Sequence, residues 1–240
     1  MTPGPRLSLF FAGLLAVASL AVPLAQGNTQ VPEPAALLSR QAWAVSLDPG
    51  FNLYRMTPSL FRSALPDARD LPQLQRLGVR TVVSFIKDND ADWLGDAQVR
   101  RVSIPLHADR VDDVDVLRVL RVLRQAEAQG PVLMHCKHGR DRTGLMAAMY
   151  RTVVQGWSRA DALAEMKAGG FGDARQMGDA IAYVEGADID ALRQALDSGA
   201  CSTRTLAACQ VGRWLRATFG ERPDEEVAQG DAVQRSRTDS

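Results

Sequence analysis

The sequence predicts a single α/β domain with a mostly parallel central sheet flanked by helices. Short β-branched apolar runs alternate with segments of helical spacing, and no repeat or linker divides the chain of 240 residues. Its globular part is long enough to enclose one core. The formal net charge is zero, so composition favours no nucleic-acid partner, and any anion site must be a local feature.

Residues 1–27 have the composition of an export signal. Arg6 is their one basic residue, an uncharged apolar run fills residues 7–22, and small residues and a proline follow. At roughly 15 residues the run is shorter than the roughly 20 that a bilayer span needs. We therefore expect cleavage, after Ala25 or after Gly27, rather than a permanent anchor. No later stretch is long and apolar enough to span. These features predict a periplasmic or secreted protein without stable membrane insertion after cleavage.

The folded domain of the chain is predicted to occupy residues 43–220. A flexible lead-in (28–42) precedes it, and a polar, disordered tail (221–240) follows it. Apolar periodicity and the turn residues between apolar runs place the elements of its first half. These are a strand pair in residues 51–66, a helix over residues 70–78, buried strands in residues 79–86 and 99–105, and a helix over residues 112–129.

Capping residues mark several helix boundaries. Asp70 is predicted as an N-cap with Gly78 as the stop of its helix, and Gly130 ends the helix that begins at residue 112. Ser158 and Asp161 have capping-box spacing at the start of a later helix. The second half is predicted to contain a buried strand in residues 131–135 and helices over residues 145–156, 158–167, 177–196 (one or two) and 206–219.

Some conspicuous residues are assigned to structure rather than to a site. Residues 87–92, KDNDAD, are predicted to be a solvated loop after a strand. His107 is as well explained as a loop residue as by a functional role. The tryptophans are expected to pack rather than to bind a ligand: Trp43, Trp93, Trp157 and Trp214.

The chain has three cysteines, an odd number for a protein in an oxidising compartment. Cys201 and Cys209 are close enough in sequence to pair, but only if the chain turns near Thr203, because eight positions along one helix span about 12 Å. If they pair, Cys136 is left as a free thiol. A thiol that stays free in such a compartment suggests use, with simple burial as the alternative.

Cys136 lies in the stretch MHCKHGRDRTG, between the strand 131–135 and a helix. Ligands of open α/β sheets bind at the carboxyl ends of the strands, and a helix N-terminus there offers free N–H groups to an anion. Gly139 allows successive amides to turn inward as an anion nest. We call residues 136–142 the cradle. Its cations and amides favour the thiolate form of the cysteine, which is the nucleophile.

The other side chains of the cradle fit an oxyanion with an electrophilic centre. Arg142 has the planar fork that grips two oxygens of a phosphate ester. Thr143 follows Arg142 directly, and we expect its hydroxyl to hydrogen-bond the sulfur of Cys136. We expect His135, which precedes the cysteine, to orient the loop by hydrogen bonding. The pattern predicts attack of sulfur on phosphorus, followed by hydrolysis of a phosphocysteine, without metal or cofactor. A Cys/His metal site is a poor competitor, because Cys136, His135 and His138 fall short of the usual four ligands.

The segment HCKHGRDRTG resembles the HCxxGxxRT signature of cysteine-dependent protein tyrosine and dual-specificity phosphatases, and matches it at every signature position. The segments LFRSALPDARDLPQLQRLGVRTVVSF and IPLHAD are similar, in order and spacing, to bacterial periplasmic dual-specificity phosphatases of the TpbA type. The similarity covers roughly Tyr54 to Leu196. The resemblance implies that Cys136 is the nucleophile and Arg142 the phosphate-binding arginine. It implies that the cradle amides come from Lys137, His138, Gly139, Arg140, Asp141 and Arg142.

A phosphatase of this kind needs an acid to protonate the leaving oxygen, and the resemblance places it on a separate loop before the cysteine. Asp109 follows a strand, on a loop that can reach the cradle, and is the first candidate. Asp112 and Asp113 come next, although they and Asp115 lie at a helix start, where acids also serve capping and the helix dipole. Asp141 is adjacent to the phosphate and is a poor first choice, but it can orient a basic neighbour or the hydrolytic water.

The expected function is an exported phosphatase acting on phosphotyrosine, and also on phosphoserine or phosphothreonine, in proteins or peptides. Lys137, His138 and Arg140 make the cradle more basic than a phosphomonoester requires. Similar loop endings occur in lipid and inositol-phosphate phosphatases, so a phosphoinositide or inositol phosphate is the alternative substrate. A non-catalytic phosphate-binding regulatory module and a sulfur transferase of the rhodanese type are further alternatives. The intact Cys136 and Arg142 argue against the first, and the Arg-Thr-Gly ending against the second.

Overall fold

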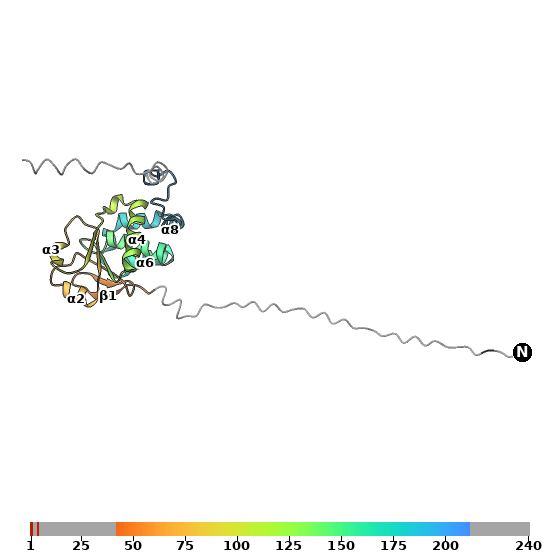
Figure 1. Ribbon diagram of the computed structural model, residues 1–240, viewed down its shortest axis with the longest axis horizontal. Coiled ribbons are helices and arrows are strands. Elements are labelled where there is room, and N and C mark those ends of the chain that lie inside the picture. Colours follow the sequence, from red (N-terminus) through yellow and green to blue (C-terminus); the bar gives the residue numbers. More distant parts are fainter. Residues whose placement is uncertain (2–3, 5–41, 212–240) are drawn as a thin grey trace, which may run out of the picture.

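The computed structural model describes residues 42–211, together with Met1 and Gly4. Within this part of the chain, six strands form one sheet in the order β1-β2-β3-β6-β4-β5, and helices lie against it (Figure 1). The strands are β1 (Val45–Asp48), β2 (Leu53–Arg55), β3 (Leu60–Ser63), β4 (Thr81–Ser84), β5 (Arg100–Ser103) and β6 (Val132–His135). The helices are α2 (Leu71–Arg76), α3 (Ala91–Leu94), α4 (Asp113–Glu127), α5 (Arg142–Met149), α6 (Arg159–Ala168), α7 (Gly178–Gly186) and α8 (Ile189–Asp197), with the short turns η1 (Ala108–Arg110), η2 (Tyr150–Val154) and η3 (Ala174–Gln176).

The sheet is mostly parallel, which confirms the predicted fold class. Strands β3, β6, β4 and β5 are parallel, whereas β1 and β2 add an antiparallel edge. His135, the last residue of β6, pairs with Ser63 of β3 and with Ser84 of β4. The three strands therefore end together, and the segments that follow them meet at one edge of the sheet, where α/β proteins place their ligand sites.

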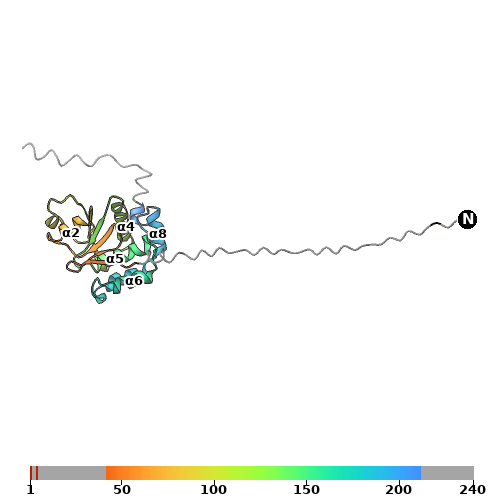
Figure 2. The ribbon, with the colours of Figure 1, turned by 90° about the horizontal axis from the view of Figure 1, so that it is seen from below.

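The sheet separates two apolar layers, because successive strand residues point to opposite faces. In β6, Val132 and Met134 belong to the larger layer, which also receives α4, α5, α7 and α8. Leu133 belongs to the smaller layer, together with residues of α2 and α3. Figure 2 shows α2 on one side of the sheet and α4, α5, α6 and α8 on the other. Burial on both faces explains why the parallel strands are continuous apolar runs in the sequence.

Most of the predicted elements are found close to their expected positions. The strand pair corresponds to β2 and β3, and the predicted helices before Leu196 correspond to α2 and to α4 through α8. Asp112 caps α4 by accepting a hydrogen bond from the Asp115 amide, and the hydroxyl of Ser158 accepts one from the Asp161 amide at the start of α6. Helix α5 continues into a π-helical turn at Tyr150–Val154.

Three local expectations need correction or fall partly outside the described residues. Asp70 occupies the N-cap position of α2, but its carboxylate accepts a hydrogen bond from the Asp67 amide instead of capping the helix. Residues 87–92 are not simply a solvated loop, because α3 begins at Ala91 and Asp90 is buried. Of the helix expected over residues 206–219, only residues 208–211 are described as helical, and the rest lies outside.

The terminal predictions also fall on undescribed positions. The export signal, nearly all of the lead-in, the tail and Trp214 lie outside the described residues. Of the other tryptophans, Trp93 and Trp157 are buried as expected for packing, and Trp43 is 43% exposed. Among the described helices, none has both the length and the apolar character needed to cross a bilayer.

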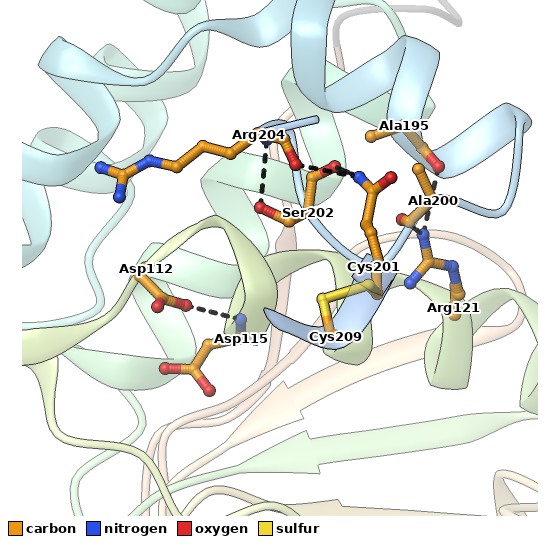
Figure 3. Close-up of a disulfide and its surroundings, with 10 residues drawn as sticks. Asp112, Asp115, Arg121, Ala195, Ala200, Cys201, Ser202, Arg204 and Cys209 are labelled. Atoms are coloured by element: carbon orange, nitrogen blue, oxygen red, sulfur yellow. Dashed lines mark hydrogen bonds between the residues drawn. A yellow bond between two sulfur atoms is a disulfide. The ribbon is translucent and has the colours of Figure 1, made fainter. Parts of the chain in front are cut away.

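Cys201 and Cys209 form a disulfide, and Cys136 remains a free, buried thiol. The chain turns between the paired cysteines, and helical structure resumes only at residue 208. Figure 3 shows the disulfide beside the N-terminal end of α4. The hydroxyl of Thr203 donates to the Asp113 carboxylate of α4, which ties this loop to the domain.

We expect one free thiol in denatured, unreduced mature protein, and three after reduction. Loss of the disulfide in a Cys201→Ser/Cys209→Ser variant should lower the free energy of unfolding by about 2–3 kcal/mol, because the bond closes a loop with a sequence separation of 8. Thiol titration and urea unfolding measure these effects. Three thiols in the unreduced protein would contradict the pairing. The double variant serves as the control, since reductant should not change its unfolding.

Candidate active site

The cradle connects the end of the central strand β6 to the start of α5. Cys136 follows β6 directly and is 2% exposed, and α5 begins at Arg142. The first turn of α5 therefore faces the cradle with amides that lack partners within the helix. Strand, cysteine loop and helix N-terminus stand in the order that the sequence predicts. The arrangement is that of an anion site with a thiol at its base.

Gly139 brings the backbone of the cradle against the end of β3. Its φ is +71°, a conformation that glycine adopts at low cost. A Cβ at this position would lie 2.5 Å from the Ala64 nitrogen and 2.5 Å from the Ser63 carbonyl carbon. Glycine is required here for both reasons: the turn of the chain and the close approach of two backbones.

Arg142 is held by two loops that leave neighbouring strands. One Nη donates to the Phe85 carbonyl at 3.1 Å, after β4, and to the Leu106 carbonyl at 3.5 Å, after β5. These bonds fix the position of the guanidinium, and its remaining N–H groups, which have no hydrogen-bond partner among the described residues, stay available for a ligand. Leu106 also begins the loop that carries Asp109, so Arg142 contacts the segment on which the sequence places the acid.

The predicted acids lie in different environments. Asp109 is in η1, and its side chain is 61% exposed with Arg110 at 3.8 Å as its ion-pair partner. Asp112 is engaged as the cap of α4. Asp113 accepts hydrogen bonds from the Tyr183 hydroxyl at 2.8 Å and from Thr203. Both alternatives to Asp109 therefore have structural roles that occupy their carboxylates.

Charge around the cradle is less uniformly positive than the residue types indicate. Burial, followed by the charges of Arg140, Lys137 and Arg142, lowers the pKa of His138, so this ring is neutral at neutral pH. Burial also raises the pKa of the half-buried Asp141, to which the neighbouring carboxylates of Asp179 and Asp109 contribute. The lasting positive charges of the loop are therefore those of its lysine and its two arginines.

Thr143 and His135 are both fully buried beside the cysteine. Thr143 Oγ1 has no hydrogen-bond partner within the described residues, which leaves its proton available for the sulfur of Cys136. His135 Nε2 lies 3.2 Å from the Asp90 carboxylate and donates to it, since a carboxylate can only accept. Asp90 also accepts a hydrogen bond from Trp93 Nε1 at 3.0 Å.

Asp90 also belongs to this site, although the sequence predicts a solvated loop at its position. It is 5% exposed and supports the histidine that precedes the nucleophile. Burial pushes the pKa of the Asp90 carboxyl up, but its bonds to His135 and Trp93 and the charges of His135 and Arg101 push it further down, so the net pKa is lowered. The one available signal was position: Asp90 follows a central strand, at the edge where the cradle lies.

Replacement of Gly139 by alanine should abolish activity by displacing the cradle. A displacement of about 1 Å in a catalytic loop can cost about 100-fold in rate, so we expect kcat/KM to fall at least about 100-fold. Gly156→Ala is the matched control, because Gly156 has φ +72° but no heavy atom within 4 Å of a Cβ. Both variants should lose about 1 kcal/mol or more of stability from backbone strain. Equal activity in the two variants would contradict the role given to the close approach.

Asp90→Asn should lower the free energy of unfolding at neutral pH by about 1–3 kcal/mol. The buried donors His135 Nε2 and Trp93 Nε1 then lose their shared carboxylate acceptor. The pKa of Asp90 is lower in the folded than in the unfolded protein, so its contribution is present above the ordinary value of 3.8 and is lost as pH falls through the folded value. Urea unfolding of the wild type and of Asp90→Asn at neutral pH and at about pH 3 measures this pH dependence. A stability difference that grows on acidification would contradict it.

Comparison with known proteins identifies the family of the chain. Residues 49–198 match the family described as "Tyrosine phosphatase family". The chain is 56% identical over 214 residues to the dual specificity protein phosphatase TpbA of Pseudomonas aeruginosa strain UCBPP-PA14, covering 89% of this chain and 95% of that protein.

Two solved structures from the same organism share the fold. The crystal structure of P. aeruginosa TpbA has a TM-score of 0.64 and 65% identity, and covers 65% of this chain and 97% of its own. A cysteine-to-serine variant of TpbA in complex with pTyr has a TM-score of 0.65 and 64% identity, and covers 66% and 98%. The resemblance found in the sequence is confirmed. This chain belongs to the tyrosine phosphatase family.

Proposed function

We propose that this chain is an exported phosphatase that hydrolyses phosphotyrosine in proteins or peptides through a phosphocysteine intermediate on Cys136. The observation that carries the proposal is a single free, buried thiol at the start of the loop that joins β6 to α5, with Arg142 at the end of that loop held by the Phe85 carbonyl. A cysteine that served only to pack the core would not require the cradle around it or Arg142 at the end of the cradle. A relative with 64% identity is described as a complex with pTyr, which supports the choice of substrate.

In the first step, the thiolate of Cys136 attacks phosphorus. The P–S bond forms as the P–O bond to the leaving group breaks, and the cradle amides and the guanidinium of Arg142 hold the equatorial oxygens. Asp109 donates its proton to the leaving oxygen, so that tyrosine departs as a neutral phenol. Asp109 fits this role better than Asp112 or Asp113, because Arg110 at 3.8 Å is the one partner of its exposed carboxylate among the described residues.

In the second step, water hydrolyses the phosphocysteine. The carboxylate of Asp109 takes a proton from the water as oxygen attacks phosphorus, and the P–S bond breaks. The unpartnered hydroxyl of Thr143 stabilises the departing sulfur by donating a hydrogen bond to it. Asp141, whose pKa is raised by burial, lies near this reaction and helps orient the water. No metal is needed, since amides and cations supply the charge stabilisation.

The alternative substrate is a phosphoinositide or an inositol phosphate, cleaved by the same chemistry. It is favoured by Lys137 and Arg140, charges beyond those that one phosphate group needs. The neutral state of His138 weakens that argument, because the loop then carries one cation fewer at neutral pH. We therefore give phosphotyrosine first place. A non-catalytic phosphate-binding module remains the proposal's competitor from another class.

Export is the second element of the proposal. It rests on the signal-like composition of residues 1–27 and on the disulfide between Cys201 and Cys209, since disulfides persist in oxidising compartments. A periplasmic location suits a Gram-negative cell, and secretion a cell without an outer membrane. The two observations are independent, because one concerns targeting and the other the folded domain.

Purified mature protein should hydrolyse phosphotyrosine peptides faster than phosphoserine peptides, phosphoinositides or inositol phosphates, with EDTA present. Cys136→Ser should bind the phosphotyrosine peptide without turning it over, because the cradle persists while the nucleophile is lost. Phosphate release and binding calorimetry measure the two effects. Faster hydrolysis of phosphoinositides or inositol phosphates would show that these, and not phosphotyrosine, are the preferred substrates. Full activity in Cys136→Ser would exclude the mechanism, and binding without hydrolysis by the wild type would favour the regulatory module.

Asp109→Asn should reduce kcat on phosphotyrosine by about 100- to 10,000-fold, the usual contribution of a general acid. The loss should be much smaller for aryl phosphates whose phenol is strongly acidic, because such leaving groups need no proton. Asp112→Asn and Asp113→Asn are matched controls. If Asp112→Asn or Asp113→Asn, and not Asp109→Asn, shows a loss that depends on the acidity of the leaving group, that residue is the general acid.

A further inference from the structure

Three successive carbonyls of the cradle accept hydrogen bonds from the region of β2 and β3. The Leu65 amide donates to the Lys137 carbonyl at 3.4 Å, Asn52 Nδ2 to the His138 carbonyl at 2.9 Å, and Arg62 Nη2 to the Gly139 carbonyl at 2.7 Å. All three donors come from residues 52–65, a segment outside the cysteine signature. Two of them are side chains, so they depend on residue identity and can be tested by substitution.

These bonds have a consequence for the inner surface of the cradle. In a planar trans peptide, the carbonyl of one residue and the N–H of the next point in opposite directions. Carbonyls held toward β2 and β3 therefore turn the following amides toward the opposite side of the loop. The amides concerned are those of His138, Gly139 and Arg140, which are the donors that an anion nest requires.

Arg62 is an unusual residue for this task. It is 1% exposed, and no carboxylate of the described residues lies within ion-pair distance of it. Its guanidinium stacks on the ring of Phe171, 3.6 Å from the centroid. Burial lowers its pKa to about 10, opposed by the charges of Glu165, Cys136 and Tyr54, so it remains a cation at neutral pH. A buried cation without a paired acid is costly to retain for packing alone.

Asn52 is held in an equally specific way. It has a φ of +57°, the one positive value among the described non-glycine residues, and asparagine tolerates this conformation better than most side chains. Its Nδ2 also donates to the Phe171 carbonyl at 3.0 Å. Asn52 therefore joins the cradle to the same loop on which Arg62 stacks. The hydroxyl of Tyr54 fixes that loop by donating to the Gly170 carbonyl at 2.8 Å.

We propose that Asn52 and Arg62 are positioning residues that clamp the outer carbonyls of the cradle and thereby aim its amides at the phosphate of the substrate. This inference rests on the proposed function of the cradle. The two residues touch neither the substrate nor the reacting atoms. They act through backbone geometry, and Arg62 adds a fixed positive charge beneath the site.

The test compares phosphate affinity with stability. Inorganic phosphate is used as a competitive inhibitor of p-nitrophenyl phosphate hydrolysis, and phosphotyrosine binding is measured calorimetrically in the Cys136→Ser background. Asn52→Gly keeps the backbone conformation accessible but removes both donor bonds. It should weaken phosphate and phosphotyrosine binding roughly 3- to 10-fold, while the midpoint of thermal unfolding changes little. Asn52→Asp, which cannot donate, should weaken binding at least as much.

Arg62→Met should weaken phosphate binding roughly 10- to 100-fold, the range expected for loss of a charged donor. Arg62→Lys should recover part of that loss, because an ammonium retains the charge and one donor to the Gly139 carbonyl. If Arg62→Met fails to fold, Arg62→Lys and the Asn52 variants still decide the question. Tyr54→Phe is the matched control: it loses a bond in the same network but none to the cradle, and should leave phosphate affinity unchanged.

The outcomes separate the clamp from the proposed function. Unchanged phosphate inhibition in Asn52→Gly and in Arg62→Lys, with normal wild-type activity, would overturn the clamp alone. Weakening by Tyr54→Phe as large as that by Asn52→Gly would overturn it in favour of general support by the network. A wild-type protein that neither binds phosphate nor hydrolyses p-nitrophenyl phosphate would overturn the proposed function and the clamp together.

Discussion

The close backbone contact between Gly139 and the end of β3 is the constraint on which the rest of the site depends. It brings the cradle near enough for donors in β3 and beside β2 and β3 to reach its carbonyls, and peptide planarity then turns the amides to the other side. The parallel order β3-β6-β4 makes the contact possible, because Ser63 and His135 are paired neighbours at the strand ends. The sheet topology thus sets the direction of a few N–H groups.

Buried polar groups surround the cradle and rigidify it at a cost in stability. Arg62 donates to the Gly139 carbonyl, and the pair of His135 and Asp90 supports the start of the cradle. Desolvation of such groups commonly offsets much of their mutual attraction. These groups therefore contribute little to stability, but their hydrogen bonds are directional. Directional contacts hold a loop in one geometry better than apolar contacts do. The site therefore has the rigidity that catalysis by preorganised amides requires.

The sequence was sufficient for most of the elements and for the central loop, because both depend on local patterns, whereas β1 and α3 were not predicted. Apolar periodicity located β4, β6 and α4, and the spacing from Cys136 to Arg142 located the cradle. Asp90, Arg62 and Asn52 were not found, since each acts on a residue far away in sequence: 45 positions separate Asp90 from His135, and 77 separate Arg62 from Gly139. The sequence predicts an exposed Asp90 because its neighbours, residues 87–89, are polar, and these neighbours are exposed. Only the fold reveals that the side chain of Asp90 itself is buried.

The central claim is that phosphate passes through the sulfur of Cys136. The most direct measurement is to quench the enzyme rapidly in acid during turnover of a phosphotyrosine peptide, and to locate the phosphoryl group by peptide mass spectrometry. We expect one phosphoryl group on the peptide that contains Cys136, accumulating when Thr143→Ala slows hydrolysis of the intermediate. Turnover without any phosphoenzyme in this variant, or a phosphoryl group on another residue, would contradict the mechanism.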